Sequence, residues 1–456
     1  MRSKSQTGHA ENDYEQMLIE MRRKWIWTNF TVISLGAWLI TSPFTFGYLD
    51  LRMIWSDAIS GALLILFSTL ALWPRFDFIG RWSVSFVGGW LQFAPLFFWA
   101  KSPAAYLNDT LVGVIAITLS ILVPMMPGMA HHMEMMKPGP EIPPGWSYNP
   151  SSWHQRAPMI ALAFIGWLGA RYLAAFQLGY IPQAWDPFFG DSTMMVLTSK
   201  VSKMFPISDA GLGAAAYTIE MLMGWMGGTT RWRSMPWMVT FFFILVVPLG
   251  IVSIVLVILQ PLAVGHWCSI CLFTALVMLF MIPLTVDEVI AMGQFMRASM
   301  RKGKPFWRTF WVGGTLEEVN QDERTPKYGA PISKIIGPMI WGVTLPWNLI
   351  LSAALGIWLM FAPTVFGSTG GAADSDHLFG ALITTFAVIV LAEVIRAGRF
   401  INVLFGAWVI VAPWLFSGAT TSAKVNDLIA GVAIIALSIP RGPIRERYAN
   451  WNRLIL

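Results

Sequence analysis

The sequence predicts an all-α, polytopic membrane protein, and three observations support that prediction. Of the 456 residues, 55% are hydrophobic and 12% are charged, about half the charged fraction of a soluble domain. The apolar residues form runs of roughly 17–25 residues, the length at which a helix crosses a bilayer. Two polar segments separate these runs into three blocks, so we expect about twelve transmembrane helices in a 4+4+4 arrangement around a central four-helix bundle.

The three blocks define the predicted spans and domains. The predicted spans are 25–45, 54–73, 84–100 and 109–127 in the first block, 158–179, 208–227, 237–260 and 267–293 in the second, and 341–364, 376–396, 400–416 and 425–440 in the third. The predicted domains are a tail at 1–24, a repeat pair at 25–128, a proline-rich linker at 129–156, a central domain at 157–295, a charged linker at 296–335, a second repeat pair at 336–441 and a tail at 442–456.

Basic residues predict the orientation of the chain, because cytoplasmic loops are enriched in Lys and Arg. They lie at alternate ends of the predicted spans, at Arg22, Arg23, Lys24, Arg75, Arg81, Arg231, Arg233, Arg396, Arg399, Arg441, Arg445 and Arg447. We therefore expect a multi-pass membrane protein, in contact with membrane lipid, with both termini and both linkers cytoplasmic. The polar N-terminus lacks the apolar core of a signal peptide. A net charge of +6 without a basic block argues against a nucleic-acid partner.

A short pattern recurs four times in the two outer blocks. Each copy has Gly-x-Trp, a proline, a loop, and Asp-x-x-x-Gly in the next helix; the first glycine and the aspartate of the copies are Gly36 and Asp57, Gly88 and Asp109, Gly356 and Asp376, and Gly406 and Asp427. The small residues predict close helix approach, and each aspartate is expected to cap the returning helix. Ion or ligand sites built on the aspartates are the alternative. The pattern resembles the SPW repeat family of small bacterial membrane modules. The resemblance implies a scaffold or interaction role and a location in a bacterial inner (cell) membrane.

The only two cysteines, Cys268 and Cys271, stand at the predicted start of the last helix of the central block. Two thiols three residues apart at a helix start lie on one side of the first turn, where they can form a small disulfide and where the helix N-terminus favours a thiolate. With no further cysteine, they do not belong to a structural disulfide framework. The predicted orientation places them outside the cytoplasm, where a disulfide persists. This position favours a redox pair.

The central block resembles the vitamin K epoxide reductase family over about residues 157–295. The resemblance is carried by Cys268-Ser-Ile-Cys271, by Val196 and Ser199 in the exterior segment, and by Asp209, Gly213 and Tyr217 at the start of a helix. It implies a four-helix bundle that binds a quinone, either ubiquinone or menaquinone, beside the cysteine pair. It also implies that electrons pass between thiols and the quinone, so the chain is expected to be a quinone-dependent thiol-disulfide oxidoreductase.

The resemblance further implies individual roles. Cys271, one turn deeper, would contact the quinone, and Cys268 would be accessible to a periplasmic thioredoxin-like or other thiol protein. The residues expected to bind the cofactor are Asp209, Tyr217, Trp267 and Ser199. Simpler interpretations stay open: Asp209 as an N-cap, Tyr217 as a core residue, and His266 as a bystander of the thiols. Glu220, in an apolar helix, is expected to be protonated, paired or functional.

Two departures from the family pattern bear on whether the chain is an enzyme or a non-catalytic module. Thr193 stands where a shuttle cysteine is expected, and Ala275 stands where family members often have tyrosine. Reduction of vitamin K epoxide is therefore not expected, and a non-catalytic quinone- or lipid-binding or assembly module is the main alternative; a transporter is the third. His131-His132-x-Glu134 has metal-binding residue types without a further donor cluster, so no metal site is expected.

Overall fold

The computed structural model describes residues 24–122, 139–317, 320–327 and 329–455. Within these ranges the protein is all-α, with two isolated bridges, Trp146–Tyr448 and Val343–Ala392, in place of sheets. The motif at His131, His132 and Glu134 lies outside the described residues. The described residues form two compact units: 24–122, 175–182 and 205–215 make the first, and the described parts of 139–174, 183–204 and 216–455 make the second.

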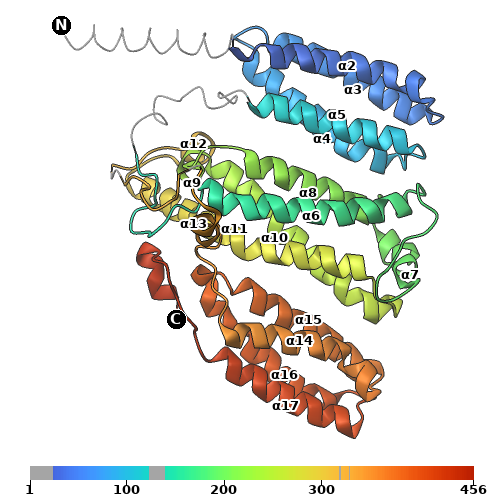
Figure 1. Cartoon of the computed structure of the whole chain (residues 1–456), viewed down its shortest axis with the longest axis vertical. Helices are drawn as coiled ribbons and strands as arrows, with labels where there is room; N and C mark the ends of the chain where they lie inside the picture. The colour runs from blue at the N-terminus through green and yellow to red at the C-terminus, as the bar shows by residue number, and fades with distance from the viewer. Residues whose placement is uncertain (1–23, 123–138, 318–319, 328, 456) are drawn as a thin grey trace. The chain divides into compact units, whose positions relative to one another are not determined.

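The long helices follow the three predicted blocks (Figure 1). The first block contains α2 (Trp27–Phe46), α3 (Leu51–Leu70), α4 (Asp77–Phe97) and α5 (Pro103–Leu122). The central block contains α6 (Trp153–Gln177), α7 (Ser192–Thr198), η1 (Ser202–Met204), α8 (Asp209–Trp225), α9 (Arg231–Ser234), α10 (Pro236–Leu259), η2 (Gln260–Val264) and α11 (Ser269–Arg301). After α12 (Phe306–Val312) and α13 (Ile332–Met339), the third block contains α14 (Trp347–Phe366), α15 (Gly370–Ile389), η3 (Glu393–Phe400), α16 (Ile401–Leu415) and α17 (Thr421–Ser438), and η4 (Ala449–Leu454) follows.

Eight helices of the described residues are long and apolar enough to cross a membrane. They are Leu51–Leu70, Pro103–Ile121, Trp153–Gln177, Pro236–Val264, Ser269–Arg301, Trp347–Phe366, Glu393–Leu415 and Thr421–Ser438. The prediction of an all-α polytopic membrane protein is confirmed.

The repeated glycines bring the two helices of each hairpin into contact. A Cβ atom built on Gly36 would lie 2.6 Å from the carbonyl oxygen of Gly61, and one on Gly88 would lie 2.8 Å from that of Gly113. The third block repeats this contact at 2.7 Å and 2.9 Å, for Gly356 with Gly380 and Gly406 with Gly431. No side chain fits at such distances, so the predicted close approach of the paired helices is confirmed.

Gly88 and its neighbour Gly89 allow a matched test of this contact. We expect Gly88→Leu to lower the thermal unfolding temperature by several degrees, because overpacking costs about 1–3 kcal/mol and the Cβ would also meet Ile117 at 2.8 Å. Gly89→Leu is the control, since a Cβ there meets nothing within 4 Å. Equal unfolding temperatures of the two purified variants would contradict the role of Gly88.

The repeated tryptophans join the two hairpins of each outer block. In the first block the indole N–H of Trp38 donates to Asn108 Oδ1 at 2.8 Å, and that of Trp90 donates to Ser56 Oγ at 3.2 Å. The third block has the same exchange, from Trp358 to Asn426 at 2.9 Å and from Trp408 to Ser375 at 3.1 Å. Each acceptor directly precedes a repeated aspartate, so the pattern encodes contacts between hairpins as well as within them.

The prediction that the repeated aspartates cap helices was wrong. Asp57 lies inside α3, whose N-cap is Asp50, and Asp427 lies inside α17, whose N-cap is Thr420. All four repeated aspartates are at most 3% exposed, and Asp57 lies beside Asp109 and Tyr48. α3, α5, α15 and α17 begin three to six residues before the starts that the apolar runs predict, so each aspartate is the seventh residue of its helix and lies beyond the first turn.

The central domain and the third block pack together within the second unit. Trp267 packs against Phe361 in a tilted arrangement, with ring centroids 5.3 Å apart, and meets the His377 ring edge-on at 5.8 Å. Far along α11, Asp287 accepts a hydrogen bond from the hydroxyl of Tyr148, whose ring contacts that of Tyr448 at 6.3 Å. Trp267 therefore attaches the third block next to the start of α11, and Tyr148 links the middle of α11 to the C-terminal tail.

Candidate functional site

The two cysteines form a disulfide at the start of α11. The chain leaves η2 through Gly265, whose φ of 73° is in the left-handed region, and Cys268 then takes an extended conformation as the N-cap of α11. The Cα atoms of Cys268 and Cys271 are 5.3 Å apart, and the N–H of Cys271 donates to the Sγ of Cys268 at 3.1 Å. The expected small disulfide at a helix start is confirmed.

Gln260 fixes the backbone of the first cysteine. It is 3% exposed, and its side-chain oxygen accepts a hydrogen bond from the N–H of Cys268 at 2.9 Å. The same residue's carbonyl closes the turn by accepting from the N–H of Gly265 at 2.8 Å. This role of Gln260 was not predicted; the available signal in the sequence is a glutamine next to Pro261 at the end of an apolar run.

A segment at residues 186–199, here called the covering segment, is attached to the first turn of α11. Asp186 accepts hydrogen bonds from the N–H of Ser269 at 3.0 Å and from its hydroxyl at 2.5 Å, and Thr193 donates to the same carboxylate at 2.5 Å. Burial raises the pKa of Asp186, but the hydrogen bonds from Ser269 and Thr193 outweigh it and hold the pKa well below its ordinary value. Asp186 is therefore a carboxylate at neutral pH, next to the helix N-terminus that favours it.

The exposure of the two sulfur-bearing residues differs from the expectation. Cys268 is fully buried, whereas Cys271 is partly exposed. The prediction that Cys268 is accessible to a partner was wrong for this arrangement. Gln260 accepts from the N–H of Cys268, and Asp186 of the covering segment holds the next residue, Ser269. Thr193, at the predicted shuttle position, is also fully buried and is held by Asp186.

Three of the residues predicted to bind a quinone lie in the second unit, and each has other contacts there. Trp267 packs against the third block, as described above. Tyr217 is buried and donates from its hydroxyl to the carbonyl of Thr274 at 2.8 Å. Ser199 ends α7 and accepts from the N–H of Ser202 at 3.3 Å. Their roles toward a quinone stay predictions.

Asp209 belongs to the first unit. Its carboxylate accepts hydrogen bonds from Gln177 and from the N–H of Ala210. The alternative interpretation as an N-cap was wrong, because Ser208 accepts the hydrogen bond from the N–H of Gly211 at 2.9 Å and caps the helix instead.

Two further titratable residues were singled out from the sequence. His266 has its Nδ1 3.5 Å from the hydroxyl of Ser192 in the covering segment. Glu220 is 1% exposed, and neither carboxylate oxygen has a hydrogen-bond partner among the described residues. Among the residues that the structure describes, no group of three or more His, Cys, Asp or Glu side chains is placed to hold a metal ion.

Comparison with known families agrees with the division of the chain. Residues 157–286 match the Vitamin K epoxide reductase family, and residues 26–123 and 346–440 match the SPW repeat domain. No curated protein and no solved structure matches the chain. The chain thus contains a vitamin K epoxide reductase family domain flanked by SPW repeat domains, which places its central domain in a family of thiol-disulfide and quinone oxidoreductases.

Proposed function

We propose that the protein is a membrane oxidoreductase that passes electrons between the Cys268–Cys271 pair and a bound quinone. The observation that carries the proposal is the disulfide at the N-terminus of α11, within a domain of this family. A partner dithiol reduces the disulfide and leaves as a disulfide, and the resulting dithiol reduces a quinone to a quinol. Two electrons and two protons pass in each half-reaction.

The domain lacks a thiol in its covering segment, so a partner must react with the pair itself. The hydroxyl of Thr193 serves as a hydrogen-bond donor to Asp186 where a shuttle cysteine is expected. Cys271, the more exposed residue of the pair, is assigned to the quinone, with Trp267 and Tyr217 as walls of its site and Ser199 as a polar group. Asp209, in the first unit, is kept as a quinone ligand on the family resemblance alone. The quinone is ubiquinone or menaquinone, and the partner is a thioredoxin-like or other thiol protein.

We place the chain in a bacterial cell membrane with twelve spans. Besides the eight helices above, α2, α4, α8 and α15 have 17 to 21 residues and complete a 4+4+4 arrangement. Both termini and both linkers are then cytoplasmic and the cysteine pair lies on the opposite side, as the basic residues predict. The domains proposed are those of the sequence analysis, with the linkers at 129–156 and 296–335.

The redox state of the pair in native membranes tests the function. After reduction and washing, we expect added quinone to return the wild-type pair to the disulfide, read as loss of the mass shift from thiol alkylation. Cys271→Ser and Cys268→Ser cannot form the disulfide, so each should keep its single thiol alkylated with and without quinone. Wild-type thiols that stay reduced with both ubiquinone and menaquinone would contradict the proposal and favour a non-catalytic binding or assembly module.

A further inference from the structure

The carboxylate of Asp186 makes five hydrogen bonds, and they join two separate parts of the chain. Within the covering segment it accepts from the N–H groups of Phe188 and Phe189 at 2.9 Å and 2.8 Å and from the hydroxyl of Thr193 at 2.5 Å. In α11 it accepts from the N–H and the hydroxyl of Ser269. Asp186 is 8% exposed. One buried side chain thus organises the covering segment and fastens it to the residue that follows Cys268.

This attachment lies where thiol exchange has to occur. A thiolate must reach a sulfur of the disulfide and displace the other one. Cys268 is fully buried in the attached state, and Ser269, Thr193 and Asp186 are each at most 8% exposed. Figure 1 shows α7 at the end of the central bundle away from α9, α12 and α13, so the segment lies at one tip of the bundle. Access to Cys268 therefore requires this segment to move.

We propose that Asp186 is a latch: its hydrogen bonds to Ser269 hold the covering segment over Cys268, and a partner thiol reaches that sulfur only when they break. The inference rests on the proposed function for its biological meaning, while the latch itself can be measured without a quinone or a partner. In the open state the partner's thiolate attacks the Sγ of Cys268 and displaces Cys271 as a thiolate. A second partner thiol then displaces Cys268, and the reduced pair passes two electrons and two protons to the quinone.

The latch is a positioning device, so its test measures the accessibility of one thiol. In a Cys271→Ser background, Cys268 is the single thiol, and its reaction rate with a maleimide in native membranes reports how often the segment opens. We expect Asp186→Ala to raise this rate at least tenfold. Asp191→Ala is the matched control, because Asp191 is an exposed carboxylate of the same segment whose side chain makes no capping hydrogen bond.

The pH profile of labelling separates a latch from a simple charge effect. Removal of a nearby carboxylate also favours the thiolate of Cys268, which would raise the rate at neutral pH and leave the high-pH plateau unchanged. A latch raises the plateau itself. Ser269→Ala provides a second test, since it removes one hydrogen bond and keeps the charge; we expect a smaller increase of the plateau, of about threefold.

Two results would overturn the latch. The first is a plateau rate for Cys268 that is unchanged in both Asp186→Ala and Ser269→Ala. The second is an equal increase for Cys271 in a Cys268→Ser background, which would show general loosening of the domain. Both outcomes are independent of whether quinone oxidises the wild-type pair, so failure of the latch and failure of the proposed function are distinguishable.

Discussion

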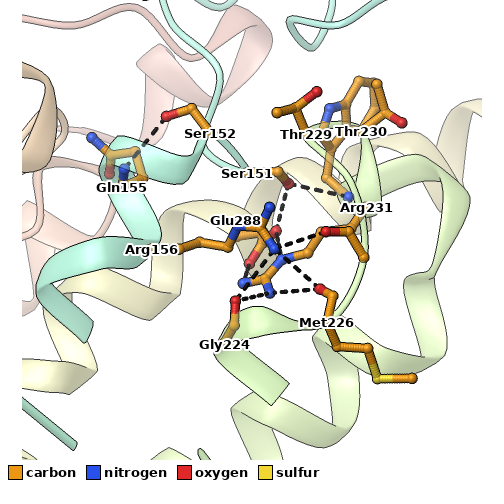
Figure 2. Close-up of polar contacts among 12 residues, drawn as sticks. Ser151, Ser152, Gln155, Arg156, Gly224, Met226, Thr229, Thr230, Arg231 and Glu288 are labelled. Carbon is orange, nitrogen blue, oxygen red and sulfur yellow. Dashed lines mark hydrogen bonds and ion pairs between the residues drawn. The ribbon is translucent and has the colours of Figure 1, made fainter. Parts of the chain in front are cut away.

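Glu288→Ala is expected to prevent stable folding of the central domain. Glu288 is 3% exposed and forms a two-pronged ion pair with the fully buried Arg231, with both N–O distances 2.6 Å (Figure 2). Ser151 also donates to Glu288 at 2.5 Å. Loss of the carboxylate leaves a buried guanidinium without its counter-charge, which costs about 3–5 kcal/mol, a large part of the stability of a domain.

The neighbouring contacts explain why Arg231 cannot simply turn towards solvent. Its Nη1 donates to the carbonyl oxygens of Met223 at 3.0 Å and Met226 at 3.3 Å, at the end of α8. Arg156 donates to the carbonyl of Met226 at 3.1 Å (Figure 2). Two guanidinium groups thus satisfy the last carbonyls of a helix that ends inside the protein.

The measurement is the thermal unfolding temperature and yield of the purified protein in detergent. Glu317→Ala is the control, because the pair of Glu317 with Lys302 is exposed, at 89% and 46%, and such pairs contribute about 0–1 kcal/mol. The double variant Arg231→Met/Glu288→Leu should recover much of the loss, since it removes both charges together. A Glu288→Ala protein as stable as the Glu317→Ala control would contradict this account.

The three-block organisation and the cysteine pair could be predicted because their signals are local. Apolar length, the Gly-x-Trp repeat and the Cys-x-x-Cys spacing are read within one helix or one hairpin, and each is visible in the structure or the family matches. The glycine contacts could be predicted from the repeat alone, because a small residue that recurs at one position of paired helices lets their backbones approach closely.

The buried hydrogen bonds and ion pairs of the central domain could not be predicted, because their partners are far apart in the sequence. Asp186 and Ser269 are 83 residues apart, and Arg231 and Glu288 are 57 residues apart. Tyr148 reaches Asp287 over 139 residues. A single sequence shows which polar residues occur in apolar surroundings, but it does not show which of them meet. The assignment of Cys268 as the accessible cysteine failed for this reason, since its cover comes from elsewhere in the chain.

Glu393→Ala is expected to release the C-terminal segment (residues 442–455). Glu393 is fully buried at the start of η3, and its carboxylate accepts hydrogen bonds from the N–H groups of Arg445 at 2.9 Å and Glu446 at 3.0 Å and from the hydroxyl of Tyr448 at 2.9 Å. Alanine leaves these three donors without their acceptor, and each buried donor so orphaned costs about 1–3 kcal/mol. These N–H and hydroxyl groups can regain hydrogen bonds if the segment moves into water.

Limited proteolysis measures this release directly. The side chains of Arg445 and Arg447 are exposed, while the backbone between them is held by Glu393 and by the hydroxyl of Ser147, which accepts from the N–H of Arg447 at 2.9 Å. We expect trypsin to cut Glu393→Ala at these arginines at least tenfold faster than wild type, with Glu393→Gln between them because its amide keeps one acceptor oxygen. Glu323→Ala, at an exposed glutamate, is the control. Equal cleavage rates for Glu393→Ala and this control would show that Arg324, which pairs with Glu446 at 2.7 Å, holds the segment without Glu393.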